Sequence, residues 1–166
     1  MDPSDEGDKE LCQAFECGSG RAVGDVRRWI TKWLWAASPA DQGETILFID
    51  RANGALAGFG TWMHRQVQIP TAGSAELVIM IEWIGVATAY QGQRTSGWSI
   101  PRTILETLEA RAREHPDSTA DMVLIAEVDV DNRRAQDVWE HFGFRFFEVV
   151  DIGPRRYNRL IRSASE

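Results

Sequence analysis

The stretch Ala75–Val86 constrains the fold more than any other part of this sequence, because it is apolar almost throughout. Only two charged residues, Glu76 and Glu82, interrupt it. A strand that lacks the usual alternation of apolar and polar residues is typical of the centre of a sheet with both faces covered. The sequence therefore predicts a central strand here, with other elements packed on both of its faces.

The elements expected around this strand include both hairpins and helices. Apolar residues at helical spacing predict a helix over 23–37, and the Ala52-Asn53-Gly54 turn predicts a hairpin. Ser99 and Pro101 predict a helix start, with a hydroxyl cap followed by proline in the first turn. The remaining expectations are strands over 10–16, 45–50, 55–67, 121–129, 144–150 and 156–161, a loop over 70–74, and helices over 100–114 and 133–142.

This order of elements defines the fold class. Strands that first pair through hairpins and then alternate with helices indicate one mixed sheet, in an α/β or α+β arrangement. We expect residues 1–9 to form a disordered acidic N-terminus and residues 10–166 to form a single domain.

The charge balance excludes several classes of partner. The 166 residues include 18 Lys and Arg against 25 Asp and Glu, which gives a formal net charge of −7. A chain with this charge lacks the overall positive field that favours nucleic acids or anionic membranes. No apolar run approaches the roughly 20 residues of a membrane span, and the acidic start of the chain does not resemble a signal peptide. We therefore expect a cytoplasmic protein with no membrane partner, and the charge counts against nucleic acid as a partner, although a local basic patch stays open.

Two segments are candidates for chemistry. The central strand leads into a polar loop that contains Gly92 and opens a helix, and the backbone N–H groups of such a loop can bind a phosphate. A plain connection between strand and helix is the alternative for this segment. The second segment follows the next strand and contains Asn132, Ala135, Trp139 and Gly143-Phe144.

Together the two segments resemble the Gcn5-related N-acetyltransferase (GNAT) family. That family has a valine followed by Gln or Arg and then glycines after its fourth strand, and an Asn-x-x-Ala-x-x-x-Tyr-x-x-x-Gly-Phe motif after its fifth. The matching positions are Val86 and Gln91 in the first segment and Asn132, Ala135, Gly143 and Phe144 in the second. The resemblance covers residues 45–162.

The resemblance implies a mixed, mostly antiparallel sheet, flanked by helices, whose central parallel strands splay apart. In the family the pantetheine arm of an acyl-CoA lies in that slot. The donor implied here is acetyl-CoA or another acyl-CoA, with a phosphopantetheine thioester on an acyl carrier protein as an open alternative. The implied cofactor-binding residues are Ile84, Gly85, Val86, Gln91, Gly92, Gln93, Arg94, Thr95, Ser96, Gly97 and Asn132. For Asn132 the alternative role is a helix N-cap, and both roles can hold together.

The phosphate loop departs from the family pattern at Arg94, which stands where the family has glycine. The apolar pair Ile104-Leu105 of the next helix also arrives late, which implies a longer loop. The side chain of Arg94 can block a close backbone approach to phosphate, or its guanidinium can replace backbone donors. Both alternatives stay open.

Glu82 is the candidate general base, because a carboxylate in so apolar a strand is costly unless it is paired or functional. Several members of the family place a glutamate at this position, facing the acceptor. An amine must lose a proton to attack a thioester, and a partly desolvated carboxylate can take it. A salt-bridged residue at the rim of the sheet is the alternative.

Trp139 occupies the position where many members of the family have the tyrosine that protonates the leaving thiolate. An indole does not titrate usefully and cannot do this, so we expect Trp139 to pack in the core. Tyr90 is the candidate acid in its place, with Tyr157 or solvent as alternatives.

The other reactive side chains give weaker signals. His64, His115 and His141 are scattered without metal-ligand spacing, so we predict no metal site, and His64 is an alternative contact for the acceptor. Cys12 and Cys17 are too few for a disulfide framework. We expect them to be reduced and to act as small apolar side chains.

We therefore expect an acyltransferase that moves an acetyl or other acyl group from a CoA or pantetheine thioester to an amine of a small molecule or protein. The amine attacks directly, since no cysteine or serine is well placed for a covalent intermediate. One alternative is a GNAT-fold binding module without activity. The other is a GNAT toxin that acetylates aminoacyl-tRNA, suggested by Phe15-Glu16-Cys17-Gly18 before a Trp-rich helix, although the net charge of −7 counts against it. A homodimer is also open, since dimers are common in the family.

Overall fold

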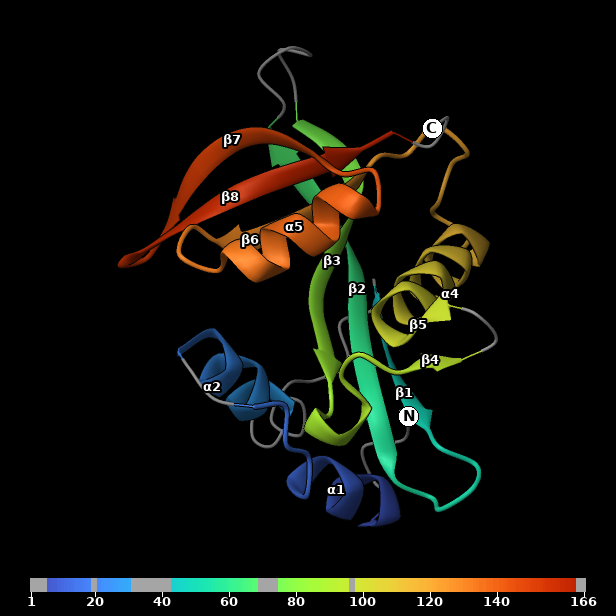
Figure 1. The fold of residues 1–166 in the computed structure, drawn as a ribbon. Helices are drawn as coiled ribbons and strands as arrows, with labels where there is room; N and C mark the ends of the chain where they lie inside the picture. The colour runs from blue at the N-terminus through green and yellow to red at the C-terminus, as the bar shows by residue number, and fades with distance from the viewer. Residues whose placement is uncertain (1–5, 19–20, 31–42, 69–74, 96–97, 164–166) are drawn as a thin grey trace.

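The computed structural model describes residues 6–18, 21–30, 43–68, 75–95 and 98–163 (Figure 1). Its helices are α1 (Glu6–Gln13), α2 (Arg21–Arg28), the 3-10 helix η2 (Thr88–Tyr90), α4 (Ile100–Glu114) and α5 (Arg133–His141). Its strands are β1 (Gly43–Ile49), β2 (Leu56–Gln68), β3 (Ala75–Val86), β4 (Arg94–Thr95), β5 (Trp98–Ser99), β6 (Leu124–Asp129), β7 (Arg145–Ile152) and β8 (Arg155–Arg162).

Six of the strands form one sheet in the order β1-β2-β3-β6-β8-β7, and β4 pairs with β5 in a separate ribbon. All neighbours in the large sheet are antiparallel except β3 and β6, which run parallel. The predicted central strand is β3, which has a neighbour on each side. The predicted mixed, mostly antiparallel sheet with a central parallel pair is therefore confirmed.

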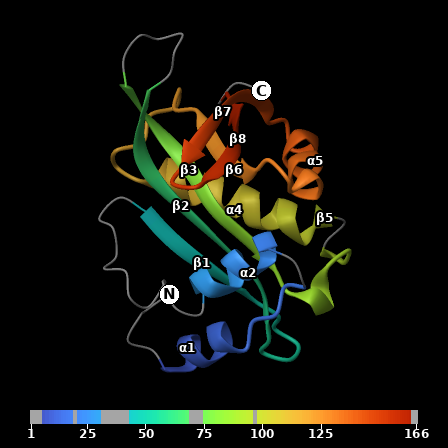
Figure 2. The same ribbon diagram turned by 90° about the vertical axis from the view of Figure 1, so that its left-hand side faces the viewer.

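The helices cover both faces of this sheet. On one face, α4 and α5 supply side chains to a core that includes Trp62 and Leu124 from the strands. On the other face, Cys12 in α1 and Phe15 just after it pack in a cluster with Phe59. Figures 1 and 2 show α2 and α4 on opposite sides of the sheet. The central strand is thus covered on both faces, as its apolar sequence predicts.

The beginning of the chain differs from the prediction. The strand expected over 10–16 is wrong, because α1 occupies most of this stretch. Cys12 and Phe15 are both buried, and residues three apart share one side of a helix but lie on opposite faces of a strand. Residues 6–9 belong to the same helix, whereas the disorder expected for residues 1–5 lies outside the described residues.

The helix predicted over 23–37 is confirmed in its first part. It begins as α2 and continues into a π-helical turn at Trp29 and Ile30. The rest of that prediction falls in residues 31–42, which lie outside the described part of the chain, as does the loop expected over 70–74.

The start of α4 is where the sequence places it, but its capping differs. Ser99 is the N-cap residue, Pro101 lies in the first turn, and His115 is the C-cap. The hydroxyl cap predicted for Ser99 is wrong, because its side chain makes no capping hydrogen bond. The N–H groups of the first turn therefore donate no hydrogen bond to the side chain of Ser99.

The connection between β3 and α4 is longer than a simple loop, as the late position of the helix implies. It contains η2 and then the β4–β5 ribbon, which lies beside the start of α4 in Figure 1. The sequence predicts that the loop after the central strand opens a helix. In the structure it does not lead directly into α4, because this ribbon intervenes.

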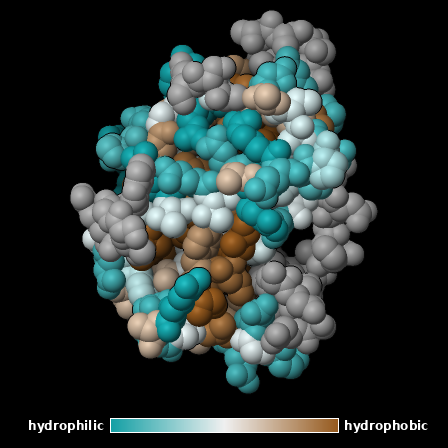
Figure 3. Space-filling view, turned by 90° about the vertical axis from the view of Figure 1, so that its right-hand side faces the viewer, coloured by the Kyte–Doolittle hydropathy of each residue, from teal (hydrophilic) through white to brown (hydrophobic). Residues whose placement is uncertain are grey.

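Few of the described large apolar side chains are strongly exposed. Seen from the side of α4, hydrophilic residues cover most of the upper half and hydrophobic residues gather in the lower half (Figure 3). The most exposed large hydrophobic residues in the described ranges are Ile49 on β1 and Phe146, Val149 and Ile152 on the edge strand β7. No described helix is long and apolar enough to cross a membrane.

Candidate active site

The parallel strands β3 and β6 pair over a short stretch and then separate. Their backbones pair over residues 79–81 of β3 and 124–126 of β6. Beyond this point β3 continues to pair with β2 as far as Val86, and β6 continues with β8 as far as Asp129. From Glu82 onward, the side of β3 that faces β6 has no partner strand among the described residues, which confirms the predicted splay.

Glu82 lies in a β-bulge at the point where the strands separate. On β2, Thr61 pairs with Trp83 and Trp62 pairs with Ile81, so Glu82 has no residue opposite it. A bulge bends its strand and changes the direction of a side chain. Here the bulge coincides with the start of the split, and Glu82 lines a cavity that opens there.

Two cavities open into the split. The first, which we call the charged cavity, has a volume of about 290 Å³ and is lined by Asp25, Val26, Arg65, Met80, Ile81, Glu82, Trp83, Ile84, Glu127, Val128, Asp129, Asn132, Ala135, Trp139, Ile152, Arg155 and Tyr157. The second, which we call the loop cavity, has a volume of about 520 Å³ and is lined by Cys17, Gly18, Val26, Ile84, Gly85, Val86, Gln91, Gly92, Pro101, Asn132, Arg134, Ala135, Val138, Trp139 and Phe142.

The two cavities adjoin each other. Both are lined by Val26, Ile84, Asn132, Ala135 and Trp139. These residues come from α2, from the unpaired part of β3, and from the N-cap and body of α5. A molecule in the loop cavity can therefore contact a molecule in the charged cavity through the split.

The carboxylate of Glu82 has no hydrogen bond or ion pair with any described residue, so the salt-bridged alternative is not seen there. Its side chain is half-buried. Burial raises the pKa of Glu82, while the charge of Arg65 lowers it and that of Glu127 raises it. An unpaired carboxyl group with a raised pKa in a cavity has the properties that proton transfer near neutral pH requires.

The other carboxylates of the charged cavity are engaged. Glu127 pairs with Arg159 at 2.7 Å, and Asp25 on α2 pairs with Arg155 on β8. Asp129 accepts a hydrogen bond from the backbone N–H of Asp131 at 2.9 Å. Glu82 is therefore the carboxylate of this cavity that is best placed to take a proton from another molecule.

Asn132 caps α5 and also borders both cavities. Its side-chain oxygen accepts a hydrogen bond from the backbone N–H of Ala135 at 3.2 Å, which confirms the N-cap role. Its side-chain nitrogen has no hydrogen-bond partner within the described residues. The cap therefore fixes the orientation of the amide and leaves N–H groups for a bound molecule.

Five of the predicted cofactor residues line the loop cavity together with Asn132: Ile84, Gly85, Val86, Gln91 and Gly92. The side chain of Gln91 donates to the carbonyl groups of Cys17 at 2.9 Å and Val86 at 3.2 Å, so it holds the loop against the N-terminal segment. Gly92 has a φ of +79°, a conformation that favours glycine.

The remaining predicted loop residues are less directly placed. Gln93 is exposed and lines neither cavity, and its side chain donates to the carbonyl of Ala89 at 2.6 Å. The backbone of Arg94 and Thr95 forms β4. Ser96 and Gly97 lie outside the described residues. The backbone position of Arg94 does not distinguish between its two predicted roles, so both stay predictions.

Tyr90 lines neither cavity. Its hydroxyl donates to Asp50 at 2.8 Å and accepts from the side chain of Asn53 at 3.1 Å, at the turn between β1 and β2. This position does not support Tyr90 as the proton donor to a leaving thiolate. Tyr157, the alternative, lines the charged cavity. Trp139 is buried, as the sequence predicts, and borders both cavities.

The two cysteines are poor nucleophiles. Burial, aided by the charge of Asp8, raises the pKa of Cys12 to about 11. Burial also raises the pKa of Cys17. Since the thiolate and not the thiol is the nucleophile, these residues favour direct attack by an acceptor over a covalent intermediate.

The histidines are not scattered in space as they are in the sequence. The rings of His64 and His115 lie 4.9 Å apart, and neither lines a cavity, so the acceptor contact considered for His64 is not supported. His141 is exposed on α5. The sequence also misses Arg65 and Arg155 in the charged cavity, because no motif marks them and they come from different strands.

Comparisons with known proteins agree with this geometry. Residues 10–144 match the sequence profile of the acetyltransferase (GNAT) family. No curated protein sequence matches the chain.

Solved structures share the fold at low sequence identity. AtaTR bound with AcCoA has a TM-score of 0.64 at 15% identity, covering 98% of this chain and 90% of its own. A bacterial toxin has a TM-score of 0.64 at 16% identity, covering 92% and 83%. Chaetomium thermophilum Naa20 in complex with a bisubstrate analogue has a TM-score of 0.57 at 17% identity, covering 98% and 84%.

Proposed function

The chain belongs to the acetyltransferase (GNAT) family, and from this premise we propose that it transfers an acetyl or other acyl group from a CoA thioester to an amine. The acceptor is an amine of a small molecule or of a protein. One observation carries the proposal. Two cavities meet where β3 and β6 separate, and Glu82, which is unpaired within the described chain, lies in one of them.

The loop cavity is the proposed site of the acyl donor. The open side of β3 at residues 84–86 offers backbone N–H and C=O groups with which a pantetheine arm can pair as an added strand. Gly92 and Pro101 in the first turn of α4 border the same cavity, and N–H groups at a helix start bind phosphate. A phosphopantetheine thioester on an acyl carrier protein is the alternative donor.

The charged cavity is the proposed site of the acceptor. The thioester supplies the acyl carbon to which the amine nitrogen bonds while the C–S bond breaks. Glu82 takes the proton that the amine loses, directly or through water. Asn132 presents amide N–H groups where the two cavities meet, and Tyr157 in the charged cavity is the proposed source of the proton for the leaving thiolate.

A matched pair of substitutions on β3 tests this assignment. Glu82→Gln removes the base but keeps the size of the side chain, so we expect kcat to fall by about 10²- to 10⁴-fold while acetyl-CoA binding is retained. Glu76→Gln, at the exposed start of the same strand, is the control and should keep the wild-type rate. Thiol release from acetyl-CoA with a panel of primary amines measures the rates.

Two outcomes would contradict the proposal. Unchanged turnover in Glu82→Gln would show that another group is the base. A folded wild-type protein that transfers no acyl group from any thioester to any amine would instead favour a binding module without activity.

A toxin that acetylates aminoacyl-tRNA is the second candidate. It rests on the resemblance of Phe15-Glu16-Cys17-Gly18 to the N-terminus of such toxins and on the fold shared with a bacterial toxin. Acetylation of charged tRNA, with the free amino acid as the control acceptor, tests this candidate. Transfer to the charged tRNA alone would replace the small-molecule or protein acceptor.

A further inference from the structure

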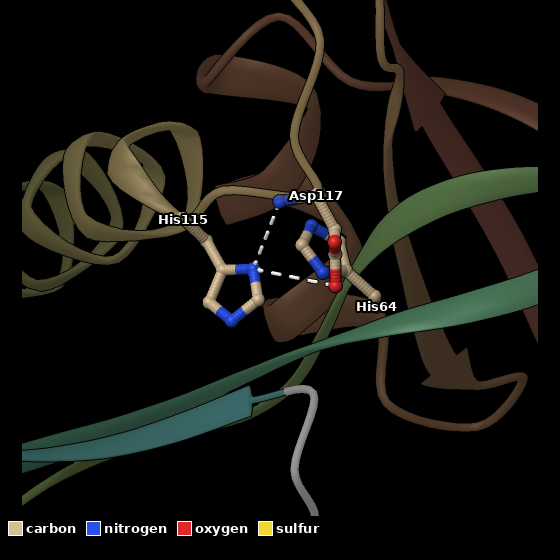
Figure 4. Close-up of side chains that lie close together, drawn as sticks. All are labelled: His64, His115 and Asp117. Carbon is tan, nitrogen blue, oxygen red and sulfur yellow. Dashed lines mark hydrogen bonds and ion pairs between the residues drawn. The ribbon is translucent and has the colours of Figure 1, made fainter.

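A side-chain cluster outside both cavities is formed by His64, His115 and Asp117 (Figure 4). His64 lies on β2, whereas His115 and Asp117 follow the end of α4. One potential ligand atom from each residue lies within 4.8 Å of the other two. Figure 4 shows the three side chains meeting between β2 and the segment after α4.

The hydrogen bonds of His64 leave one of its ring nitrogens without a partner. Nε2 lies 2.8 Å from the hydroxyl of Ser118, and that hydroxyl donates its own hydrogen to the carbonyl of Ala112. Ser118 can therefore only accept from His64, so Nε2 carries the hydrogen and Nδ1 of the neutral ring has a free lone pair.

This lone pair is buried. His64 is only 3% exposed, and its Nδ1 has no hydrogen-bond partner within the described chain. A buried polar atom without a hydrogen-bond partner lowers the stability of the fold. A bound group that Nδ1 of His64 could contact would remove this cost.

His115 and Asp117 bring further lone pairs to the same place. The backbone N–H of Asp117 donates to Nδ1 of His115 over 3.3 Å, so this nitrogen carries no hydrogen in the neutral ring. A carboxylate oxygen of Asp117 lies 3.9 Å from it. The Asp117 side chain is 64% exposed, so the cluster is open to solvent on this side. A cation can replace the 3.3 Å hydrogen bond at Nδ1 of His115 and bind this nitrogen together with the Asp117 carboxylate and the unpartnered Nδ1 of His64.

We propose that His64, His115 and Asp117 bind a divalent zinc ion. Two imidazole nitrogens and one carboxylate oxygen are a ligand set that suits Zn²⁺, and solvent can supply the fourth ligand. Bonds of about 2.0–2.2 Å place tetrahedral ligands about 3.4 Å apart, so a cluster 4.8 Å wide closes by roughly 1.4 Å on binding. The exposed side chain of Asp117 and the half-buried ring of His115 can make this movement.

The surroundings fit a structural ion. The hydrogen bond from His64 to Ser118 orients the ring, as the outer partners of metal-bound histidines do. The ion links β2 to the chain that follows α4, and none of its three ligands lines the charged cavity or the loop cavity. We therefore expect it to stabilise the fold.

Calorimetric titration of the tag-free, chelator-treated protein with Zn²⁺ tests the site. We expect one equivalent to bind with micromolar or tighter Kd. His115→Ala and Asp117→Asn, which change side chains outside the buried core, should each weaken binding by at least tenfold. His141→Ala, which removes the exposed histidine of α5, is the matched control and should keep the wild-type affinity.

Thermal unfolding supplies a second readout. Zn²⁺ at about a hundredfold excess over its Kd should raise the Tm of the wild type and of His141→Ala by roughly 5–10 °C, and that of His115→Ala by less. The proposal is overturned if the wild type does not bind one equivalent of Zn²⁺. Equal affinities of His115→Ala and the wild type would overturn it as well, as would weaker binding by His141→Ala.

Discussion

Glu82 combines partial burial with a carboxylate that no described residue pairs with, and this sets how activity should depend on pH. Burial raises its pKa above the ordinary value of 4.5. A general base acts only when it is deprotonated, so acyl transfer should rise with pH through this raised pKa. The pH profile of kcat/KM measures the effect, and an acid limb that ends at or below 4.5 would contradict it.

Arg65 supplies the control for that profile. Its charge lowers the pKa of Glu82, and its side chain is exposed on β2. Arg65→Gln should therefore move the acid limb to higher pH, whereas Arg51→Gln, in the exposed turn between β1 and β2, should leave it in place. Superimposable profiles of Arg65→Gln and the wild type would count against Glu82 as the titrating group.

The raised pKa of Glu82 also has a cost in stability. A carboxyl group whose pKa is higher in the folded state binds its proton more tightly when folded, so its contribution to stability falls as pH rises through the unfolded and folded values. Glu82→Gln carries no charge and should be more stable than the wild type near neutral pH. It should lose this advantage below pH 4.5. Urea unfolding at both pH values measures the difference, with Glu76→Gln as control, and a less stable Glu82→Gln at neutral pH would contradict the prediction.

Gly85 leaves space for an aromatic ring beneath the split. A Cβ atom at this position would lie 2.3 Å from the ring of Phe59, which stacks on Trp29 at 5.7 Å. Gly85→Ala should therefore lower the free energy of unfolding by about 1–3 kcal/mol through overpacking. Gly24→Ala, in α2 with open space around it, should instead raise it by up to about 1 kcal/mol. Urea unfolding compares the two variants, and equal stabilities would show that the ring of Phe59 moves freely.

At the scale of elements, one ion pair holds α2 against β8 beside the charged cavity. Both terminal nitrogens of the Arg155 guanidinium donate to Asp25, which is 8% exposed. Among the described residues, Arg155→Met leaves this carboxylate with only Arg28, 3.7 Å away and more exposed, so the free energy of unfolding should fall by about 1–3 kcal/mol.

The neighbouring pair of Arg156 and Asp151 is the matched control for this loss. Its side chains are 68% and 77% exposed, so Arg156→Met should change the free energy of unfolding by less than about 0.5 kcal/mol. Denaturant unfolding distinguishes the two variants. Equal free energies of unfolding for Arg155→Met and Arg156→Met would show that the ion pair between Arg155 and Asp25 does not stabilise the packing of α2 against β8.

Local sequence signals predict elements well where they are strong. The apolar run of β3 and the Ser99 and His115 boundaries of α4 are such signals, and both elements lie where they are expected. The acidic segment before Gln13 carries a weak pattern, and packing beside Phe59 makes it a helix instead of a strand. Strands as short as β4 and β5 carry no periodic pattern, so the ribbon could not be predicted.

At the scale of the whole molecule, the candidate site joins residues that are distant in sequence. The resemblance to a family predicts Val86 and Asn132 on the two sides of the split, because their motifs follow the two central strands. Arg65, Arg155 and other residues of the charged cavity come from α2, β2, β6 and β8, where no local pattern marks them. Contacts of this kind exist only after the sheet has formed.

Binding of acetyl-CoA tests the assignment of the loop cavity most directly. Calorimetry combined with hydrogen exchange would measure its affinity and locate its contacts. We expect one equivalent to bind per chain, with a Kd between about 1 μM and 1 mM, and we expect slower exchange of the backbone N–H groups at residues 84–86 on the open side of β3. A folded protein that binds no acetyl-CoA at millimolar concentration, or binds it without protecting these residues, would contradict the proposed donor site.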